Sequence, residues 1–240
     1  MTPILLFLVG HWYLSAFCQT FFLHRYASHR MFSMPLFWER FFYALTFLTQ
    51  GTSYLNPRTY ALLHRMHHAH SDTAEDPHSP VFFRSPLSMM WNTLRVYLDI
   101  FSGKRKPGPD DDYPRWDAFD RLADGALPRA AFGAGYVAFY AHFATEWWMY
   151  LFLPVHFLMG PVHGAIVNWC GHKYGYANFD NRDRSRNTFF ADLLTMGELM
   201  QNNHHRFGKR VNFAVRWFEF DPTYPLIRAL ERFGVVRLNS

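Results

Sequence analysis

Histidines at short, regular spacings are the residues of this sequence best suited to chemistry. Fourteen histidines occur among 240 residues, and eight of them fall in four short clusters. The clusters are His24 and His29 in HRYASH, His64, His67 and His68 in HRMHH, His172 in NWCGH, and His204 and His205 in QNNHH. Imidazole binds iron, zinc, copper and nickel, and eight imidazoles exceed what one ion can take. The sequence therefore predicts a site for two metal ions.

Helix geometry predicts how two of these clusters present their side chains. Positions i, i+3 and i+4 share one face of a helix, so we expect His64, His67 and His68 to point to one place. The QNNHH cluster repeats the spacing with an amide, Gln201, in its first position. It is therefore expected to offer a mixed set of ligands.

The other two clusters have different spacings. Asn168 stands four residues before His172, so the two side chains share a helix face. His24 and His29 are five residues apart and do not align on an ideal α-helix. To act as metal ligands, these two histidines need either a loosened helical turn or two different metal ions to bind.

Chance and packing explain a single cluster, but not four together. One HxxHH pattern arises by chance at the level of a few per cent in a chain this rich in histidine, and a lone pair is usually packed or solvated. All four clusters lie where an apolar stretch meets a polar one. The remaining histidines lack this placement, and we expect hydrogen-bonded core or interface roles for the isolated ones and support of the second cluster for its neighbours. The isolated ones are His11, His142, His156 and His163, and the neighbours are His70 and His78.

Four apolar stretches are available to position the clusters. The mean hydropathy of -0.17 hides them, because residues 1–23 carry no charged side chain. Pro3–Leu23 is long enough to cross the roughly 30 Å hydrocarbon layer. Pro35–Leu55 is as long but contains Glu39 and Arg40. Two further helices are predicted from about Leu127 to Thr145 and from about Tyr150 to Cys170.

The histidines restrict how these stretches cross a membrane. If residues 35–55 crossed, the first two clusters would emerge on opposite faces about 30 Å apart. We therefore expect that segment to be interfacial or re-entrant, which leaves about three transmembrane helices. Lys and Arg are absent before Arg25 and abundant in the polar regions, which predicts a multi-pass protein with its histidine sites facing the cytoplasm.

The resulting fold class is all-α, since strand signals are absent. We expect one domain over residues 1–240, with a cytoplasmic helical cap that carries the histidine clusters. A Pro/Gly/Asp-rich loop is predicted from Lys104 to Pro114. Cys18 and Cys170 both lie in apolar stretches, so neither a disulfide framework nor a cysteine-rich zinc site is expected. No signal peptide is evident, because the apolar N-terminus has no basic residues before it.

The charge of the chain limits the classes of binding partner that are expected. The net charge of +5 is not accompanied by a nucleic-acid recognition motif, so an anionic membrane surface or a phosphate-bearing substrate is the expected partner. The basic run Lys104, Arg105 and Lys106 could dock an acidic electron donor or a CoA phosphate, but a solvated loop is the default interpretation.

The histidine motifs resemble those of a known family, the membrane fatty acid desaturases, and particularly the Δ9 acyl-CoA (stearoyl-CoA-like) branch. The matching segments are HRYASHRMF, HRMHHAHSDTAEDPHSP and GELMQNNHHRF, within a resemblance that runs from about Leu23 to Phe207. It implies that the eight clustered histidines are the ligands of two non-haem irons and that Asn168 is linked to one iron through water. Gln201 departs from this branch, which has a ninth histidine there. Other desaturase branches carry Gln, so the departure concerns the coordination of one iron.

Carboxylates are expected behind the ligands, because a metal-bound imidazole usually donates its other N–H to an acid or a carbonyl. Asp72, Asp76 and Glu198 are the candidates. Glu198 stands seven residues before His205, which predicts a shared helix face.

The resemblance implies an O2-dependent desaturation of a fatty acyl chain carried by CoA or by a lipid. The sequence has no nucleotide loop, no iron–sulfur cysteines and no cytochrome domain, so the electrons are expected from a separate ferredoxin or cytochrome b5-like donor. A related diiron membrane lipid hydroxylase is the alternative enzyme. A metal carrier or a haem protein is a different class, for which eight clustered imidazoles are excessive.

Overall fold

The computed structural model describes residues 1–108 and 112–239, and most of these residues are helical. In chain order the elements are α1 (Thr2–Cys18), η1 (Gln19–Ser28), β1 (Phe32–Ser33), α2 (Leu36–Gln50), η2 (Gly51–Ser53), α3 (Pro57–His70), α4 (Pro86–Phe101), α5 (Asp117–Ala123), α6 (Ala126–Phe143), η3 (Trp147–Phe152), α7 (Leu153–Phe157), α8 (Met159–Gly171), α9 (Gln201–Arg206), α10 (Thr223–Arg232) and β2 (Arg237–Leu238). The element η1 is π-helical, and η2 and η3 are 3-10 helices.

The predicted helical fold is confirmed, with one local exception. The strands β1 and β2, each of two residues, pair antiparallel and join Phe32 to Leu238. Two residues are too short for an alternating pattern, so sequence periodicity could not reveal them. Of the predicted loop from Lys104 to Pro114, residues 109–111 lie outside the described part of the chain.

The first two elements form one continuous helix that is longer than predicted. Thr2–Ser28 comprises 27 residues, against the predicted Pro3–Leu23. Its last ten residues, the element η1, are all buried. They are wound more loosely, with i to i+5 bonds such as the one from the amide of His29 to the carbonyl of His24, at 3.2 Å. This loosened turn brings two histidines that are five residues apart to the same side of the helix.

The helix Thr2–Ser28 is the one helix among the described residues that is long and apolar enough by itself to cross a membrane. The segments Trp147–Phe157 and Met159–Gly171 together meet the same criterion, but they are bent by 74° relative to one another. The stretch Leu127–Thr145 forms α6 close to the expected bounds, but α6 does not meet the criterion.

The prediction of one straight helix from Tyr150 to Cys170 is therefore wrong. The helix breaks at Leu158, whose backbone is not helical. Three residues later, Pro161 has no N–H to donate to the carbonyl of Phe157, and its ring interferes with that carbonyl. The break turns α8 out of the direction of α7 and toward the histidine clusters.

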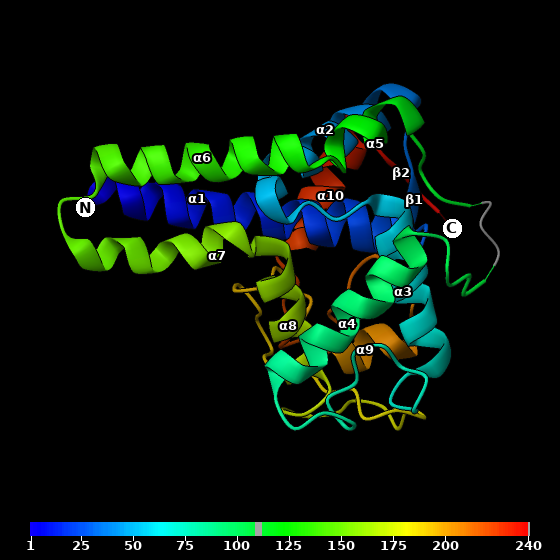
Figure 1. Ribbon diagram of the computed structural model, residues 1–240. Helices are drawn as coiled ribbons and strands as arrows, with labels where there is room; N and C mark the ends of the chain where they lie inside the picture. Colours follow the sequence, from blue (N-terminus) through cyan, green and yellow to red (C-terminus); the bar gives the residue numbers. More distant parts are fainter. Residues whose placement is uncertain (109–111, 240) are drawn as a thin grey trace.

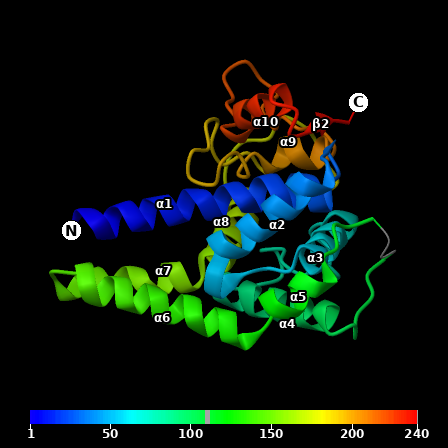
Figure 2. The same ribbon diagram turned by 90° about the horizontal axis from the view of Figure 1, so that it is seen from above.

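The helices divide into a long bundle and a cap. Figure 1 shows α1, α6 and the η3–α7 segment running side by side, with the N-terminus at their far end. The cap is built from α3, α4, α9 and α10 around η1, at the other end of α1 (Figures 1 and 2). The bent helix α8 connects the bundle to the cap.

A chain of buried polar groups joins the bundle internally. Nδ1 of His11 lies 2.7 Å from Nδ1 of His156, Nε2 of His11 lies 2.8 Å from the carbonyl of Thr49, and the hydroxyl of Tyr140 lies 2.9 Å from Nε2 of His156. The carbonyl can only accept, so His11 donates from Nε2, His156 donates from Nδ1 to His11, and Tyr140 donates to His156. The hydrogen-bonded core role expected for these two histidines is confirmed, but they are partners of each other and not isolated.

The segment Pro35–Leu55 forms α2 and then turns back through η2. Gly51 has a φ of +50°, and a Cβ there would lie 1.9 Å from the hydroxyl oxygen of Tyr136, so this turn requires glycine. Asn56 then caps α3 by accepting a hydrogen bond from the amide of Thr59, at 3.1 Å. The chain thereby leaves η1 and returns to it, and α3 packs against η1 (Figure 2).

Candidate metal centre

All eight clustered histidines meet inside the cap, where they form two groups. The five-histidine group consists of His24, His29, His64, His68 and His204. The three-histidine group consists of His67, His172 and His205. Within each group the ligand atoms lie within 4.8 Å of one another. Two neighbouring sites for cations result, drawn from η1, α3, the end of α8 and α9.

The expectation that His64, His67 and His68 point to one place is wrong. His64 and His68 belong to the five-histidine group, and His67 belongs to the other. Successive residues of an α-helix are rotated by about 100°, so adjacent histidines diverge while residues four apart nearly align. His204 and His205 are separated in the same way. Each adjacent histidine pair therefore serves both sites, one imidazole to each.

Distances within the five-histidine group fit an ion. Nε2 of His204 lies 3.0 Å from Nε2 of His24 and 3.0 Å from Nε2 of His68, and the Nε2 atoms of His29 and His64 are 2.8 Å apart. Two nitrogens bound at right angles, about 2.1 Å from one ion, lie about 3.0 Å apart. The spacing of these imidazoles is thus that of adjacent ligands on one metal.

Carboxylates contact the outer nitrogens of two histidines in the three-histidine group, as the sequence led us to expect. Asp76 lies 2.9 Å from Nδ1 of His67, and Asp72 lies 2.9 Å from Nδ1 of His172. A carboxylate accepts, so each Nδ1 carries the proton and each Nε2 keeps its lone pair. Nε2 of His172 is buried without a hydrogen-bond partner. That lone pair is free for a cation.

The carboxylate of Glu198 lies near a histidine other than the one predicted. It is 2.5 Å from Nδ1 of His24 and also accepts a hydrogen bond from the hydroxyl of Thr20. The predicted shared face with His205 is wrong, because α9 begins only at Gln201 and Glu198 precedes it. Burial alone would raise the pKa of Glu198, but His24 and other neighbouring groups hold it below its usual value.

Sequence reasoning missed a fourth carboxylate, Asp183. It lies 2.7 Å from Nδ1 of His205 and also accepts hydrogen bonds from the amide and the hydroxyl of Ser185. Its burial alone would raise its pKa, but the hydrogen bond from His205 lowers the pKa well below the usual range. Asp183 lies in a loop 22 residues before its partner, so no helical spacing connects the two. Only the fold reveals it.

Six of the eight clustered histidines are neutral in this environment. Burial lowers the pKa values of these six, and repulsion between neighbouring imidazoles lowers them further. The pKa lies well below 6.5 for His29, His64, His67, His68 and His204. The pKa of His205 is also lowered by burial, against the opposing effect of Asp183. Neutral imidazoles keep the lone pairs that a metal requires.

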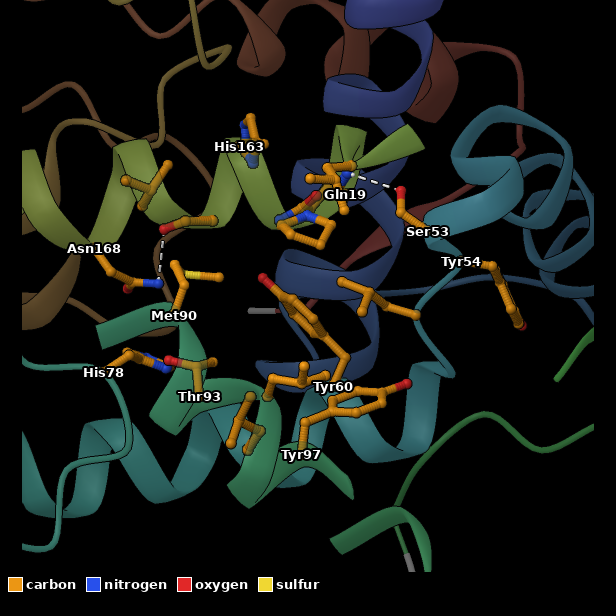
Figure 3. A pocket seen from close by; sticks show the side chains of 18 of the residues that line it. Gln19, Ser53, Tyr54, Tyr60, His78, Met90, Thr93, Tyr97, His163 and Asn168 are labelled. Atoms are coloured by element: carbon orange, nitrogen blue, oxygen red, sulfur yellow. Dashed lines mark hydrogen bonds between the residues drawn. The ribbon is translucent and has the colours of Figure 1, made fainter. Parts of the chain in front are cut away.

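An apolar cavity of about 620 Å³ reaches the five-histidine group at His64. Apolar side chains of α4 form one wall, and α8 forms the other. His64, Asn168 and Gln201 line it together with Glu198. Figure 3 shows Asn168 and His78 facing the cavity from α8 and from the loop after α3. The cavity therefore connects an apolar compartment to the five-histidine group through His64.

The amides predicted beside the metals have protein partners as well. Asn168 donates from Nδ2 to the carbonyl of Gly164 at 2.9 Å, and Gln201 donates from Nε2 to the carbonyl of Glu198 at 2.7 Å. Both amide oxygens thus remain available as acceptors or ligands. Gly171 gives Gln201 its space, since a Cβ there would lie 2.4 Å from Cγ of Gln201.

His78 is the one neighbouring histidine that lines this cavity among the described residues. It is 4% exposed, its ring centroid lies 4.4 Å from that of His67, and neither of its ring nitrogens has a hydrogen-bond partner. Burial lowers its pKa to about 3, and His67 contributes to the shift. His70 is exposed on the outer side of α3. Of the two neighbours of the second cluster, His78 alone lies against a candidate ligand.

Comparison with known proteins shows which family has a similar sequence. The model of the fatty acid desaturase family matches residues 1–239. The Delta-9 desaturase-like 5 protein of Arabidopsis thaliana is 30% identical over 232 residues, which cover 92% of this chain and 72% of the relative. The sn-1 stearoyl-lipid 9-desaturase of Anabaena variabilis is 28% identical over 236 residues, which cover 95% of this chain and 80% of the relative. The Acyl-CoA 5-desaturase AL21 of Anemone leveillei is 28% identical over 229 residues, which cover 91% of this chain and 66% of the relative.

The resemblance inferred from the histidine motifs is thereby confirmed. The match extends over almost the whole chain and includes every histidine of both groups. The chain belongs to the fatty acid desaturase family and is a fatty acyl desaturase enzyme.

Proposed function

We propose that this protein introduces a double bond into a fatty acyl chain with O2, using a non-haem diiron centre held by its eight clustered histidines. One observation carries the proposal: two adjacent imidazole groups lie in one cap, and an apolar cavity reaches one of them at His64. The acyl carrier is a CoA thioester or a membrane lipid, the two carriers that appear in the names of the relatives.

Each metal has a distinct set of protein ligands in this proposal. The five-histidine group holds one iron through imidazole nitrogens alone. The three-histidine group holds the other, with Asn168 next to it through water and Gln201 at the position of a further ligand. When bound, the irons supply the oxidising power that unactivated C–H bonds require. The chain itself supplies ligands of one tautomer, a water-poor cavity and the position of the substrate.

Positioning is the main task of the cavity. A saturated acyl chain offers no polar group near the reacting carbons, so its place must be set by shape. The wall formed by α4 contributes Leu94 and Leu98, and the opposite wall contributes Gly160 and Gly164. Glycine on α8 leaves room for the chain beside the metals, while the leucines exclude water.

Electrons and membrane position complete the proposal. The electrons come from a separate ferredoxin or cytochrome b5-like protein, which delivers them to the histidine cage from outside. We further propose a multi-pass protein in which α1, α6 and the bent segment before α8 lie in the membrane. The histidine cage then faces the cytoplasm, on the side from which residues 35–55 enter and leave.

The first prediction concerns metal content. Purified protein should contain about two iron ions per chain, and removal of iron should abolish desaturation, although zinc can fill the same imidazole sites. Elemental analysis and product mass spectrometry measure both.

Substitutions of histidine distinguish ligands from other histidines. His68→Ala should lose iron and activity, while His142→Ala should keep both. His156→Ala should lose thermal stability but keep most activity. Full activity of metal-free protein would contradict the proposal, and a product heavier by one oxygen would identify a hydroxylase.

The second prediction concerns the carboxylate behind His205. Asp183→Asn should lower metal affinity on the order of 10–100-fold, because an amide no longer fixes the tautomer of His205. Iron retention during dialysis against a chelator measures the effect. Asp180→Asn, at an exposed position of the same loop, is the matched control and should retain iron like the parent. Equal retention by both variants would show that Asp183 does not support the metal.

The third prediction concerns Gln201. Gln201→His should be tolerated, because imidazole is a stronger ligand than an amide. Gln201→Leu should lose about tenfold in iron retention or turnover, because it removes the amide oxygen and keeps the volume. A fully active Leu variant would exclude Gln201 from the metal surroundings.

The fourth prediction concerns topology. Single cysteines replacing Ser33 and Glu75, both exposed, should react alike with a membrane-impermeant reagent in sealed vesicles, while a cysteine at Thr2 should show the opposite accessibility. Cys170→Ser provides the background, because Cys18 is buried. Opposite labelling at positions 33 and 75 would mean that residues 35–55 cross the membrane.

A further inference from the structure

A group of large apolar side chains lies uncovered on the outside of the cap. Phe189, Phe190, Leu193 and Leu194 are each 47–59% exposed, and Phe220 is 48% exposed. Phe220 is held beside them, since its amide donates to the carbonyl of Phe190 at 2.7 Å. We call these five residues the cap patch. Contiguous exposed apolar surface of this kind marks a site of interaction with a protein or a membrane.

The cap patch is held in place by a rigid turn. Asp192 lies between its members and is itself fully buried. Its carboxylate accepts hydrogen bonds from the amides of Thr195 and Leu199, both at 2.9 Å, and from the amide of Gly197 at 3.1 Å. A buried carboxylate with three amide donors fixes the local backbone. The two leucines after Asp192 are thus directed outward by the fold.

The position of the cap patch relative to α1 indicates what covers it. The indole N–H of Trp12 donates to the carbonyl of Leu194 at 2.8 Å. Trp12 stands twelve residues before His24, which at 1.5 Å per residue is about 18 Å along the helix toward the N-terminus. Figure 2 shows the loop before α9 beside α1, reaching in the direction of the N-terminus. The cap patch therefore extends from the metal centre toward the membrane.

The exposed surface of α1 is also apolar. Leu6, Val9 and Leu14 are 69%, 53% and 53% exposed on the helix that is long and apolar enough to span a bilayer. Trp217 is 96% exposed and follows Arg216, three residues before Phe220. Tryptophan and arginine are typical of the headgroup region, where an aromatic ring and a cation both find partners.

We propose that the cap patch is seated in the bilayer, at the boundary between headgroups and acyl chains, as a second membrane contact of the cap beside α1. A lipid surface fits better than a protein partner, because Leu194 of the patch is hydrogen-bonded to Trp12 on the helix that is long and apolar enough to span a bilayer. The same turn leads from the patch to Glu198, which contacts Nδ1 of His24. Lipid contact thus holds in place the segment that supports a ligand of the five-histidine group.

Spin labelling in nanodiscs tests this proposal independently of catalysis. Leu193→Cys and Phe190→Cys, each in a Cys170→Ser background, are labelled with a nitroxide in discs of phosphatidylcholine and phosphatidylglycerol. Collision rates are measured with O2, which dissolves in lipid, and with a neutral nickel chelate, which stays in water. Ser102→Cys is the control, because Ser102 is exposed at the end of α4, away from the N-terminus (Figure 1).

The expected result is a reversal between the patch and the control. Labels at 193 and 190 should collide more with O2 than with the nickel chelate, and the label at 102 should show the opposite ratio. Nickel collision rates at 193 and 190 equal to that at 102 would overturn the proposal. Screening of these labels from both reagents would also overturn it, because that result indicates a protein partner or a second copy of the chain.

Discussion

The convergence of neutral imidazole lone pairs is the constraint on which the rest of this structure depends. Nitrogens that face one another at 2.8–3.0 Å, as those of His29 and His64 or His24 and His204 do, repel unless a proton or a cation lies between them. Burial lowers the pKa of His29, His64 and His204 well below 6.5, so these imidazoles are neutral and each has one N–H. One such N–H can bridge two facing nitrogens, but a cation satisfies several lone pairs at once, and the fold holds the ligands ready for it. Four carboxylates do so for four of the eight histidines, because each leaves the proton on Nδ1 and the lone pair on Nε2. They are Glu198, Asp76, Asp72 and Asp183.

Much of this arrangement was predictable from the sequence because it depends on local helix geometry. The placement of each cluster at the end of an apolar stretch predicted that they meet, and the spacing of His24 and His29 predicted a loosened turn as one of two solutions. The π-helical winding of η1 is that solution. The division into two groups was equally present in the 100° rotation between His67 and His68, but the sequence alone did not show that one helix contributes histidines to both groups.

What the sequence could not predict depends on contacts between distant segments. Asp183 supports His205 from a loop, and Glu198 supports His24 from another element altogether, 174 residues away in sequence. No periodic pattern connects such pairs. The bend at Leu158 was hard to predict from the sequence for a different reason. The hydropathy is continuous across the bend, and only the missing N–H of Pro161 marks the break. That bend is essential to the site, since a straight helix would continue along α7 and carry His172 away from the cap.

A buried ion pair explains how the loosened helix keeps its register. Arg25 is fully buried directly after His24, pairs with Asp221 at 2.9 Å and lies 4.0 Å from the ring centroid of Phe213. A pair of this kind contributes little net stability, because both ions lose their hydration. Breaking it is different, since rotation of η1 would leave an unpaired charge in the interior at a cost of about 3–5 kcal/mol. A π-helix forms weaker bonds than an α-helix and is otherwise free to rewind. The ion pair therefore penalises rewinding, and because Arg25 adjoins His24, it fixes the direction of that imidazole toward Glu198 on one side and the metal group on the other.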